Sequence, residues 1–473
     1  MARNSMNLTD ERISPMKVIL WLAWPLFLEQ ILSTFVSFVD TAMVGALGVN
    51  ATASVSISNS FVFLLNGIMI ALGTGLTAYV ARSVGARDYE AARAYIRHAI
   101  ILLLLVGLPL VLITIALHRR IPAWMGADPE ILDDASRYLL ITSIGRIFTM
   151  AIMVLGSVFR GRGDTKLPLR VNIFVNLINV VGNYLLINPP HTLNLAGVAF
   201  HMPGAGWGVV GAAVSTAFSW FVGGTALTVM LFVKDDPSRI SIHDSFRIDP
   251  ALIRRVVDLS TPAMLERFCM SASGIVVTRC IASLGTVVVA AHSVALTAES
   301  ISFMPAFAFA TAVTTLVGQS LGARKPELAV RYTMWTQGLG AVCMLIAGAT
   351  LYVFAEPLVR LITPDEAAIA LAKECLRIVA FIQPVQTAAW TYAGALRGAG
   401  DTRRPFYITA VCNWGIRTLG AWLCIRVFHM GLPQAVMCMC ADNFVRMIWM
   451  GATFHKGAWK HALDKPEEEA RPA

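Results

Sequence analysis

The sequence predicts an all-α polytopic membrane protein, with twelve transmembrane helices in two six-helix lobes. Three observations predict this fold: an apolar composition, long uncharged segments, and an internal repeat of nearly constant spacing. Hydrophobic residues make up 56% of the 473 residues and charged residues only 14%, and the mean hydropathy is +0.65. Because soluble proteins carry about 25% charged residues, most of this surface must face something other than water.

Long uncharged segments supply the predicted spans. Residues 99–117 read AIILLLLVGLPLVLITIAL, close to the ~20 apolar residues that cross a bilayer core. Residues 171–233 also lack Asp, Glu, Lys and Arg, and no cleavable signal is expected in the polar N-terminus. We expect twelve spans, at 17–43, 51–80, 98–118, 136–158, 168–188, 208–233, 255–283, 288–319, 332–355, 374–396, 405–428 and 432–453.

The basic residues predict the orientation of these spans. Most of the 38 Lys and Arg residues fall on the side that carries both termini. The other side has only seven: Arg119, Arg120, Arg137, Arg360, Lys373, Arg377 and Arg426. Since positive charge accumulates in cytoplasmic loops, we expect a multi-pass protein of the cytoplasmic (inner) membrane with both termini inside. The net charge of +9 is therefore not interpreted as a sign of nucleic-acid binding.

The repeat divides the chain into two halves. Pro25 recurs 237 residues later as Pro262 and Glu29 as Glu266, and GAR at 85–87 recurs at 322–324. Because each half has an even number of spans, the halves face the same way and are related by a pseudo-twofold axis along the membrane normal. The expected parts are an N-terminal cytoplasmic segment, the first lobe, a cytoplasmic linker, the second lobe and a cytoplasmic tail, at 1–16, 17–234, 235–254, 255–453 and 454–473.

The motif R-G-x-G-D-T occurs once in each half, beginning at Arg160 and at Arg397. Both copies follow the fourth span and precede the fifth, so we expect equivalent cytoplasmic turns. Glycine permits a tight turn, and Asp or Thr can cap the next helix. The pattern does not match a phosphate-binding loop, and no HExxH or other catalytic motif occurs, so an enzyme is not expected. The eight cysteines form no CxxC pair, and no metal site is expected.

Differences between the halves point to candidate functional residues. Asp40 in the first span corresponds to Val277 in the second half. An ionisable residue inside a span costs at least ~2.5 kcal/mol and is functional by default. The fifth span also carries an asparagine stripe at helical spacing, largely missing from the second half: Asn172, Asn176, Asn179 and Asn183. For Asn172 we expect only an interhelical hydrogen bond.

Pro25 and Pro262 are expected to be hinges of the first and seventh spans. A proline within a membrane helix frees backbone groups and permits bending. Glu29 and Glu266 follow these prolines by one turn. Because both halves keep them, we expect a mainly structural role for the pair, with Glu266 also a candidate contact for substrate or a second coupling ion.

Several stretches resemble the multidrug and toxic compound extrusion (MATE) transporters. They are WPLFLEQILSTFVSFVDTAMVGALG at 24–48, AAHSVALTAESISFMPAFAFATAVTTLVGQSLGARKPELAVRY at 290–332, and the paired RGxGDT turns. The resemblance covers about residues 15–455 and implies two lobes forming a V around a central cavity, with efflux driven by a proton or sodium gradient. Asp40 looks like the first-span Asp of bacterial and archaeal members, including DinF-like ones. Thr216 matches a sixth-span pocket threonine, and Asn183 stands where the pattern often has Asp.

This chain departs from the NorM-like pattern in its second half. At the register of the functional seventh-span Glu it has Met270, and at that of the tenth-span Asp it has Gln386. A second-lobe cation site of the NorM kind is therefore not expected. We expect proton coupling at Asp40, Asn176, Asn179, Asn183 and Thr216. Further contacts to substrate or a second ion are expected at a smaller set: Gln30, Glu266, Met270 and Gln386.

The expected function is efflux by alternating access, with a proton as the coupling ion and no other cofactor. The expected substrates are amphipathic, often cationic, organic compounds, and a monomer in contact with membrane lipids suffices. Sodium coupling is one alternative. A flippase for a lipid-linked precursor is another, although such superfamily members typically have about fourteen spans and a strongly basic cavity.

Overall fold

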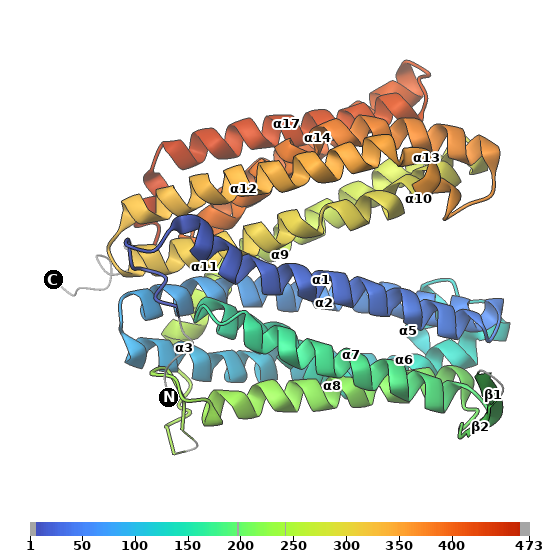
Figure 1. Cartoon of the computed structure of the whole chain (residues 1–473), viewed down its shortest axis with the longest axis horizontal. Helices are drawn as coiled ribbons and strands as arrows, with labels where there is room; N and C mark the ends of the chain where they lie inside the picture. The colour runs from blue at the N-terminus through green and yellow to red at the C-terminus, as the bar shows by residue number, and fades with distance from the viewer. Residues whose placement is uncertain (1–5, 196–197, 242, 464–473) are drawn as a thin grey trace.

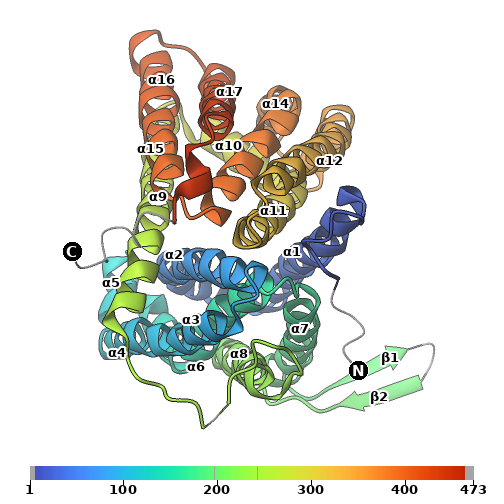
Figure 2. The same ribbon diagram turned by 90° about the vertical axis from the view of Figure 1, so that its left-hand side faces the viewer.

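The computed structural model describes residues 6–195, 198–241 and 243–463, which form two helical bundles lying side by side (Figures 1 and 2). The first bundle comprises α1 (Pro15–Gly45), α2 (Val49–Gly85), α3 (Tyr89–Leu102), the π-helical turn η1 (Leu103–Gly107), α4 (Leu108–Ala116), α5 (Arg120–Trp124), α6 (Pro129–Gly161), α7 (Lys166–Ile187) and α8 (Gly208–Val233).

The second bundle repeats this order with more interruptions. It comprises α9 (Pro250–Ala282), α10 (Thr286–Ser302), α11 (Met304–Gly322), α12 (Pro326–Val353), α13 (Ala355–Arg360), α14 (Glu366–Gly398), α15 (Arg403–Val411), η2 (Cys412–Thr418), α16 (Leu419–Trp422), η3 (Leu423–Val427) and α17 (Leu432–His455), followed by the 3₁₀ turn η4 (Ala458–His461).

Every predicted span coincides with helical structure. Within the described residues, nine helical segments are long and apolar enough to cross a membrane. The predicted spans at 255–283, 374–396 and 432–453 are not among them. They correspond to α9, α14 and α17, which are 33, 33 and 24 residues long but carry more polar residues. These three helices pack within the second bundle, and all three contribute charged residues to the central cavity described below.

The structure differs from the prediction in three places. The loop between α7 and α8 contains an antiparallel hairpin of β1 (His191–Leu195) and β2 (Val198–Met202), so the fold is not purely helical. The predicted single span at 288–319 breaks between α10 and α11. Pro305 lies in the first turn of α11, where its missing N–H does no harm, whereas its first-half counterpart Ile68 lies inside the continuous α2. The short helices α5 and α13 were not predicted.

The two bundles touch closely at the end that carries the two RGxGDT turns. A Cβ atom added to Gly85 would stand 2.0 Å from the carbonyl oxygen of Gln319, and one added to Gly322 would stand 1.9 Å from that of Arg82. Residues 82 and 319 are themselves counterparts in the repeat, so this contact between α2 and α11 has twofold symmetry. Only glycine allows two backbones to approach so closely.

The first helix bridges the two bundles. Its first turns pack in an apolar cluster with α11 and α12 of the second bundle, through Val18, Leu22 and Leu26. Further along, α1 lies against α7 of its own bundle. A movement of α1 therefore affects both bundles at once.

Candidate functional site

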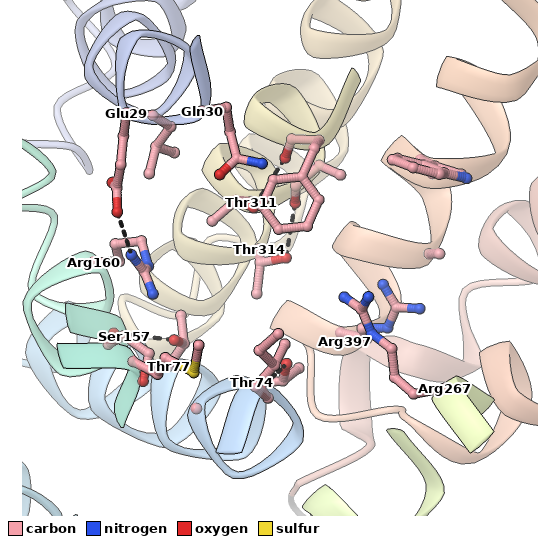
Figure 3. A pocket seen from close by; sticks show the side chains of 18 of the residues that line it. Glu29, Gln30, Thr74, Thr77, Ser157, Arg160, Arg267, Thr311, Thr314 and Arg397 are labelled. Carbon is pink, nitrogen blue, oxygen red and sulfur yellow. Dashed lines mark hydrogen bonds and ion pairs between the residues drawn. The ribbon is translucent and has the colours of Figure 1, made fainter. Parts of the chain in front are cut away.

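A cavity of about 460 Å³ lies between the two bundles. Its walls come from α1, α2, α6, α7 and α8 on one side and from α9, α11, α14, α15 and α17 on the other. Figure 3 shows how the polar side chains of the two walls face each other. Aromatic and thioether groups also line it, and such groups suit varied apolar ligands: Trp220, Phe307, Trp390, Met153, Met270 and Met450.

The first RGxGDT arginine reaches a carboxylate on α1. Arg160 Nη1 lies 3.7 Å from Glu29 Oε1, at the end of α6. Asn172 on α7 donates to the same oxygen at 2.5 Å, so it makes the interhelical contact that was expected of it. Glu29 Oε2 is buried without a hydrogen-bond partner in the described part of the chain. Glu29 is thus held on one oxygen only.

The second RGxGDT arginine makes the equivalent contact in the other bundle, and makes it more completely. Arg397 Nη2 donates to both oxygens of Glu266, at 2.7 and 2.8 Å. Thr409, the counterpart of Asn172, donates to Glu266 Oε1 at 2.9 Å. The repeated motif therefore joins three helices of each bundle at the wall of the cavity, in addition to making the predicted turn.

Asp40 lies eleven residues beyond Glu29, roughly 16 Å along α1, among neutral polar side chains. Asn183 on α7 donates to it at 2.7 Å. With the Asn179 amide oriented to satisfy both of its ends, its nitrogen donates to the two Asp40 oxygens at 2.8 and 3.1 Å, and its oxygen accepts from the Thr216 hydroxyl at 3.2 Å. Ser215 of α8 fixes the backbone by donating to the Asn179 carbonyl at 2.9 Å.

The structure thus brings together Asp40 and three of the four residues predicted beside it. Asn179 and Asn183 are buried, as interior groups of α7. Asn176 lies instead at the wall of the central cavity, and it makes no hydrogen bond to Asp40 in the described residues. The asparagine stripe therefore serves two places, the cavity at its beginning and Asp40 at its end.

The four residues predicted to contact substrate or a second ion do not all lie in the same place. Gln30, Glu266 and Met270 line the central cavity. Gln386 does not, and its Oε1 is buried without a hydrogen-bond partner among the residues described. Pro25 and Pro262 lie inside α1 and α9, each one turn before its glutamate.

Among the residues that the structure describes, the second bundle has no counterpart of the Asp40 cluster. Its buried charged pair is Asp442 with Arg446 on α17, and Arg446 also donates to Asn413 at 3.2 Å. The positions equivalent to Asp40 and Asn183 are Val277, which is buried in an apolar cluster, and Gly420. No group of three His, Cys, Asp or Glu residues suited to a metal occurs in the described residues.

Several cavity and site residues were missed by the sequence reasoning. It placed Arg160 and Arg397 only in turns, and it assigned Arg267 no place in the cavity. Arg146 of α6 was not singled out, although it is buried and stacks over Trp220 at 5.2 Å. A signal was present for the first two, because each arginine stands at the end of a span and recurs together with its glutamate.

Comparison with known proteins agrees with this architecture. A family model described as MatE matches residues 25–185 and 262–423, so its two matches begin at Pro25 and Pro262, the spacing of the internal repeat. The chain is 28% identical over 453 residues to "Probable multidrug resistance protein NorM" of Thermotoga maritima, covering 94% of this chain and 93% of that protein. It is 29% identical over 409 residues to "Multidrug resistance protein PmpM" of Pseudomonas aeruginosa, covering 85% and 82%.

Solved structures share the fold over nearly the whole chain. One, described as the "outward-facing conformation of a multidrug resistance MATE family transporter", has a TM-score of 0.87 at 21% identity and covers 97% of this chain and 99% of its own. A transporter of the MOP superfamily from Pyrococcus furiosus, described as having a binding pocket of reverse polarity, has a TM-score of 0.87 at 22% identity and covers 97% and 99%.

Proposed function

Because the chain belongs to the MatE family, a family of multi-pass membrane transporters, we propose that it is a proton-coupled efflux antiporter for amphipathic organic compounds. Relatives that match most of its length are named multidrug resistance proteins. The cavity between the bundles is of the size that drug-like ligands fill. Its aromatic and thioether lining supports a broad choice of apolar bodies.

The observation that carries the proton assignment is the set of partners around Asp40. Amide and hydroxyl groups surround it, and neither Lys nor Arg forms an ion pair with it in the described residues. A carboxylate without a cationic partner in a membrane interior is costly to keep charged, so it readily takes up a proton. Asp40 is therefore suited to alternate between two charge states.

The coupling follows from the hydrogen bonds that change with that charge. A charged Asp40 only accepts, from Asn179 and Asn183, whereas a protonated Asp40 also donates. The α1–α7 contact must then re-pair, and α1 can respond by bending at Pro25. Because α1 also packs on the second bundle, such a bend would change the cavity between the bundles and displace the substrate outward. A proton can drive this change only because the two states bind it differently.

One observation favours sodium as the second candidate. Asn183 Oδ1 is buried with no hydrogen-bond partner in the described residues, next to the oxygens of Asp40, Asn179 and Thr216. Oxygen ligands are what a hard cation requires. Only one of these ligands is a carboxylate, which makes the site weaker for sodium than a site with two acids.

Transport in proteoliposomes under separately imposed gradients distinguishes the two ions. We expect dye efflux to follow a pH gradient at negligible sodium. Efflux should vanish in Asp40→Asn, which keeps the shape of the side chain but cannot release a proton. Efflux that follows a sodium gradient with the pH clamped, and ignores a pH gradient alone, would replace the proton by sodium. Absence of efflux under both gradients would reject the transport proposal itself.

A further inference from the structure

The charges that line the central cavity do not balance. Six charged side chains line it: Glu29, Arg160, Glu266, Arg267, Arg397 and Arg446. Three of the four arginines form an ion pair, Arg446 with the buried Asp442 and the other two with the glutamates. Arg267 is the fourth. It makes no ion pair and no hydrogen bond in the described residues, so the cavity carries an excess positive charge.

Arg267 is placed to meet a ligand. It follows Glu266 on α9 and its side chain is exposed to the cavity space. Both oxygens of Glu266 are already occupied by Arg397 and Thr409. Arg267 is close enough to Arg397 to be repelled by it and to Glu266 to be attracted, and Figure 3 shows the two guanidinium groups beside each other on the same wall. One carboxylate thus faces two guanidinium groups.

The internal repeat indicates that this charge is not a requirement of the scaffold. In the first bundle the position equivalent to Arg267 is Gln30, which also lines the cavity, next to a Glu–Arg pair of the same kind. The pair therefore forms without an additional cation beside it. At this position the cavity wall formed by the first bundle carries the neutral Gln30, and the wall formed by the second bundle carries the positively charged Arg267.

We propose that Arg267, with Arg397 beside it, is an anion-binding subsite, and that the exported compounds are amphipathic organic anions bearing a carboxylate, sulfonate or phosphate group. The planar guanidinium fork matches these groups and holds them by two parallel hydrogen bonds. Arg267 has no counter-ion among the described residues, and an anionic ligand would supply one. The aromatic rings of Trp390 and Phe307 line the same cavity and suit the apolar body of such a compound.

This inference rests on the proposed efflux function and names its substrate class. It departs from the sequence-based expectation of cationic compounds, because that expectation came from the family resemblance and not from the cavity. The phosphate of a lipid headgroup offers the same chemistry as a soluble anion. A cavity of about 460 Å³ fits a compact organic molecule, so we assign the subsite to soluble amphipathic anions.

Equilibrium binding to the purified full chain tests the subsite independently of transport. The probes are fluorescein as an anionic dye and ethidium as a cationic dye, followed by fluorescence anisotropy. We expect Arg267→Gln, which installs the side chain of Gln30, to raise the Kd for fluorescein at least about tenfold, the loss of one charge-assisted contact. Binding of ethidium should be unchanged or tighter. Arg267→Lys should recover part of the affinity, since it keeps the charge but lacks the fork.

The control variant is Arg403→Gln, which removes an exposed arginine outside the cavity and should change neither Kd. An unchanged Kd for fluorescein in Arg267→Gln, or tighter binding of ethidium than of fluorescein by the unaltered protein, would overturn the subsite. Vesicles containing a fluorescent phosphatidylglycerol supply the lipid arm. Headgroup flipping that is lost in Arg267→Gln while dye binding is unchanged would reassign the subsite to lipid and overturn the proposal. Failure of gradient-driven efflux with normal dye binding would reject only the transport function.

Discussion

Within each bundle, polar contacts join the first and the fifth membrane span, and these contacts differ in kind between the two bundles. In the first bundle α1 and α7 are joined at two levels, by Asn172 to Glu29 at 2.5 Å and by Asn183 to Asp40 at 2.7 Å. The second bundle keeps the first level, where Thr409 donates to Glu266 at 2.9 Å. The positions equivalent to Asp40 and Asn183 are Val277 and Gly420, and the further polar contact there is a neutral one, between the hydroxyl groups of Ser273 and Thr418 at 2.7 Å.

The level that both bundles share belongs to the scaffold, and the level that only one bundle has is the candidate for coupling.

The helices that carry these residues differ as well. In the first bundle α7 is a regular α-helix, whereas its counterpart contains the π-helical turns η2 and η3. Such turns require local compensation and often occur at functional positions, and Asn413, which binds Arg446, lies within η2.

The largest expected effect is on efflux, and it comes from a substitution at the second level. Asp40→Asn should abolish pH-driven efflux, a loss of at least about 100-fold, because the coupling carboxyl contributes to every cycle. The matched change Val277→Thr, nearly the same size as valine, should leave efflux within about threefold. Both are measured as initial rates of dye efflux in proteoliposomes. Equal losses in the two variants would break the comparison between the bundles.

A smaller effect, on stability, is expected from substitutions of Glu29 and Glu266, the two glutamates of the level that both bundles share. Glu266→Gln should lower the stability by about 3 kcal/mol, because it removes the buried carboxylate to which Arg397 donates two hydrogen bonds. Glu29→Gln should cost about 1 kcal/mol, because Arg160 lies 3.7 Å away and only one oxygen is bonded. Apparent melting temperatures in detergent rank the two variants. A greater loss in Glu29→Gln would contradict the difference in pairing.

Equivalent substitutions at a contact that both bundles form in the same way should have similar effects on stability. Gly85→Ala and Gly322→Ala each place a methyl group about 2 Å from a carbonyl oxygen of the other bundle, and overpacking of this kind costs about 1–3 kcal/mol. We expect similar decreases in melting temperature for both. The controls are Gly67→Ala and Gly338→Ala, whose added methyl groups meet nothing within 4 Å. Unequal effects of the first pair would mean that the contact is not symmetric.

The smallest effect is expected from a labelling test of sidedness, which should leave efflux intact. Thr165 and Thr402 of the RGxGDT turns are buried and are poor positions for a reagent. Glu90 and Glu327 are exposed counterparts at the first turns of α3 and α12. In a cysteine-free background, Glu90→Cys and Glu327→Cys should react with a membrane-impermeant thiol reagent only from the cytoplasmic side. Labelling of either from outside intact cells would refute the orientation.

The helical spans, the duplication and the difference at Asp40 follow from the amino-acid sequence alone. Apolar length and helical period are local properties, since twenty uncharged residues must form a helix inside a bilayer whatever surrounds them. The duplication supplied an internal alignment, which exposed Asp40 against Val277 and the asparagine stripe against its counterparts. Asn176 faces the central cavity instead of Asp40. The helical period places it on the same stripe as the other three asparagines, so the sequence could not distinguish its direction from theirs.

Which charged side chains pair with one another depends on how the helices pack. Arg160 and Glu29 are far apart in the chain, and their pairing depends on how α6, α7 and α1 pack against one another. The break between α10 and α11 and the π-helical turns likewise depend on the packing of neighbouring helices. Arg267 has no ion-pair partner among the described residues because the two carboxylates of the cavity wall, Glu29 and Glu266, pair with other arginines. Long-range pairing of this kind leaves no period in the sequence, because it is fixed by the relative placement of whole helices.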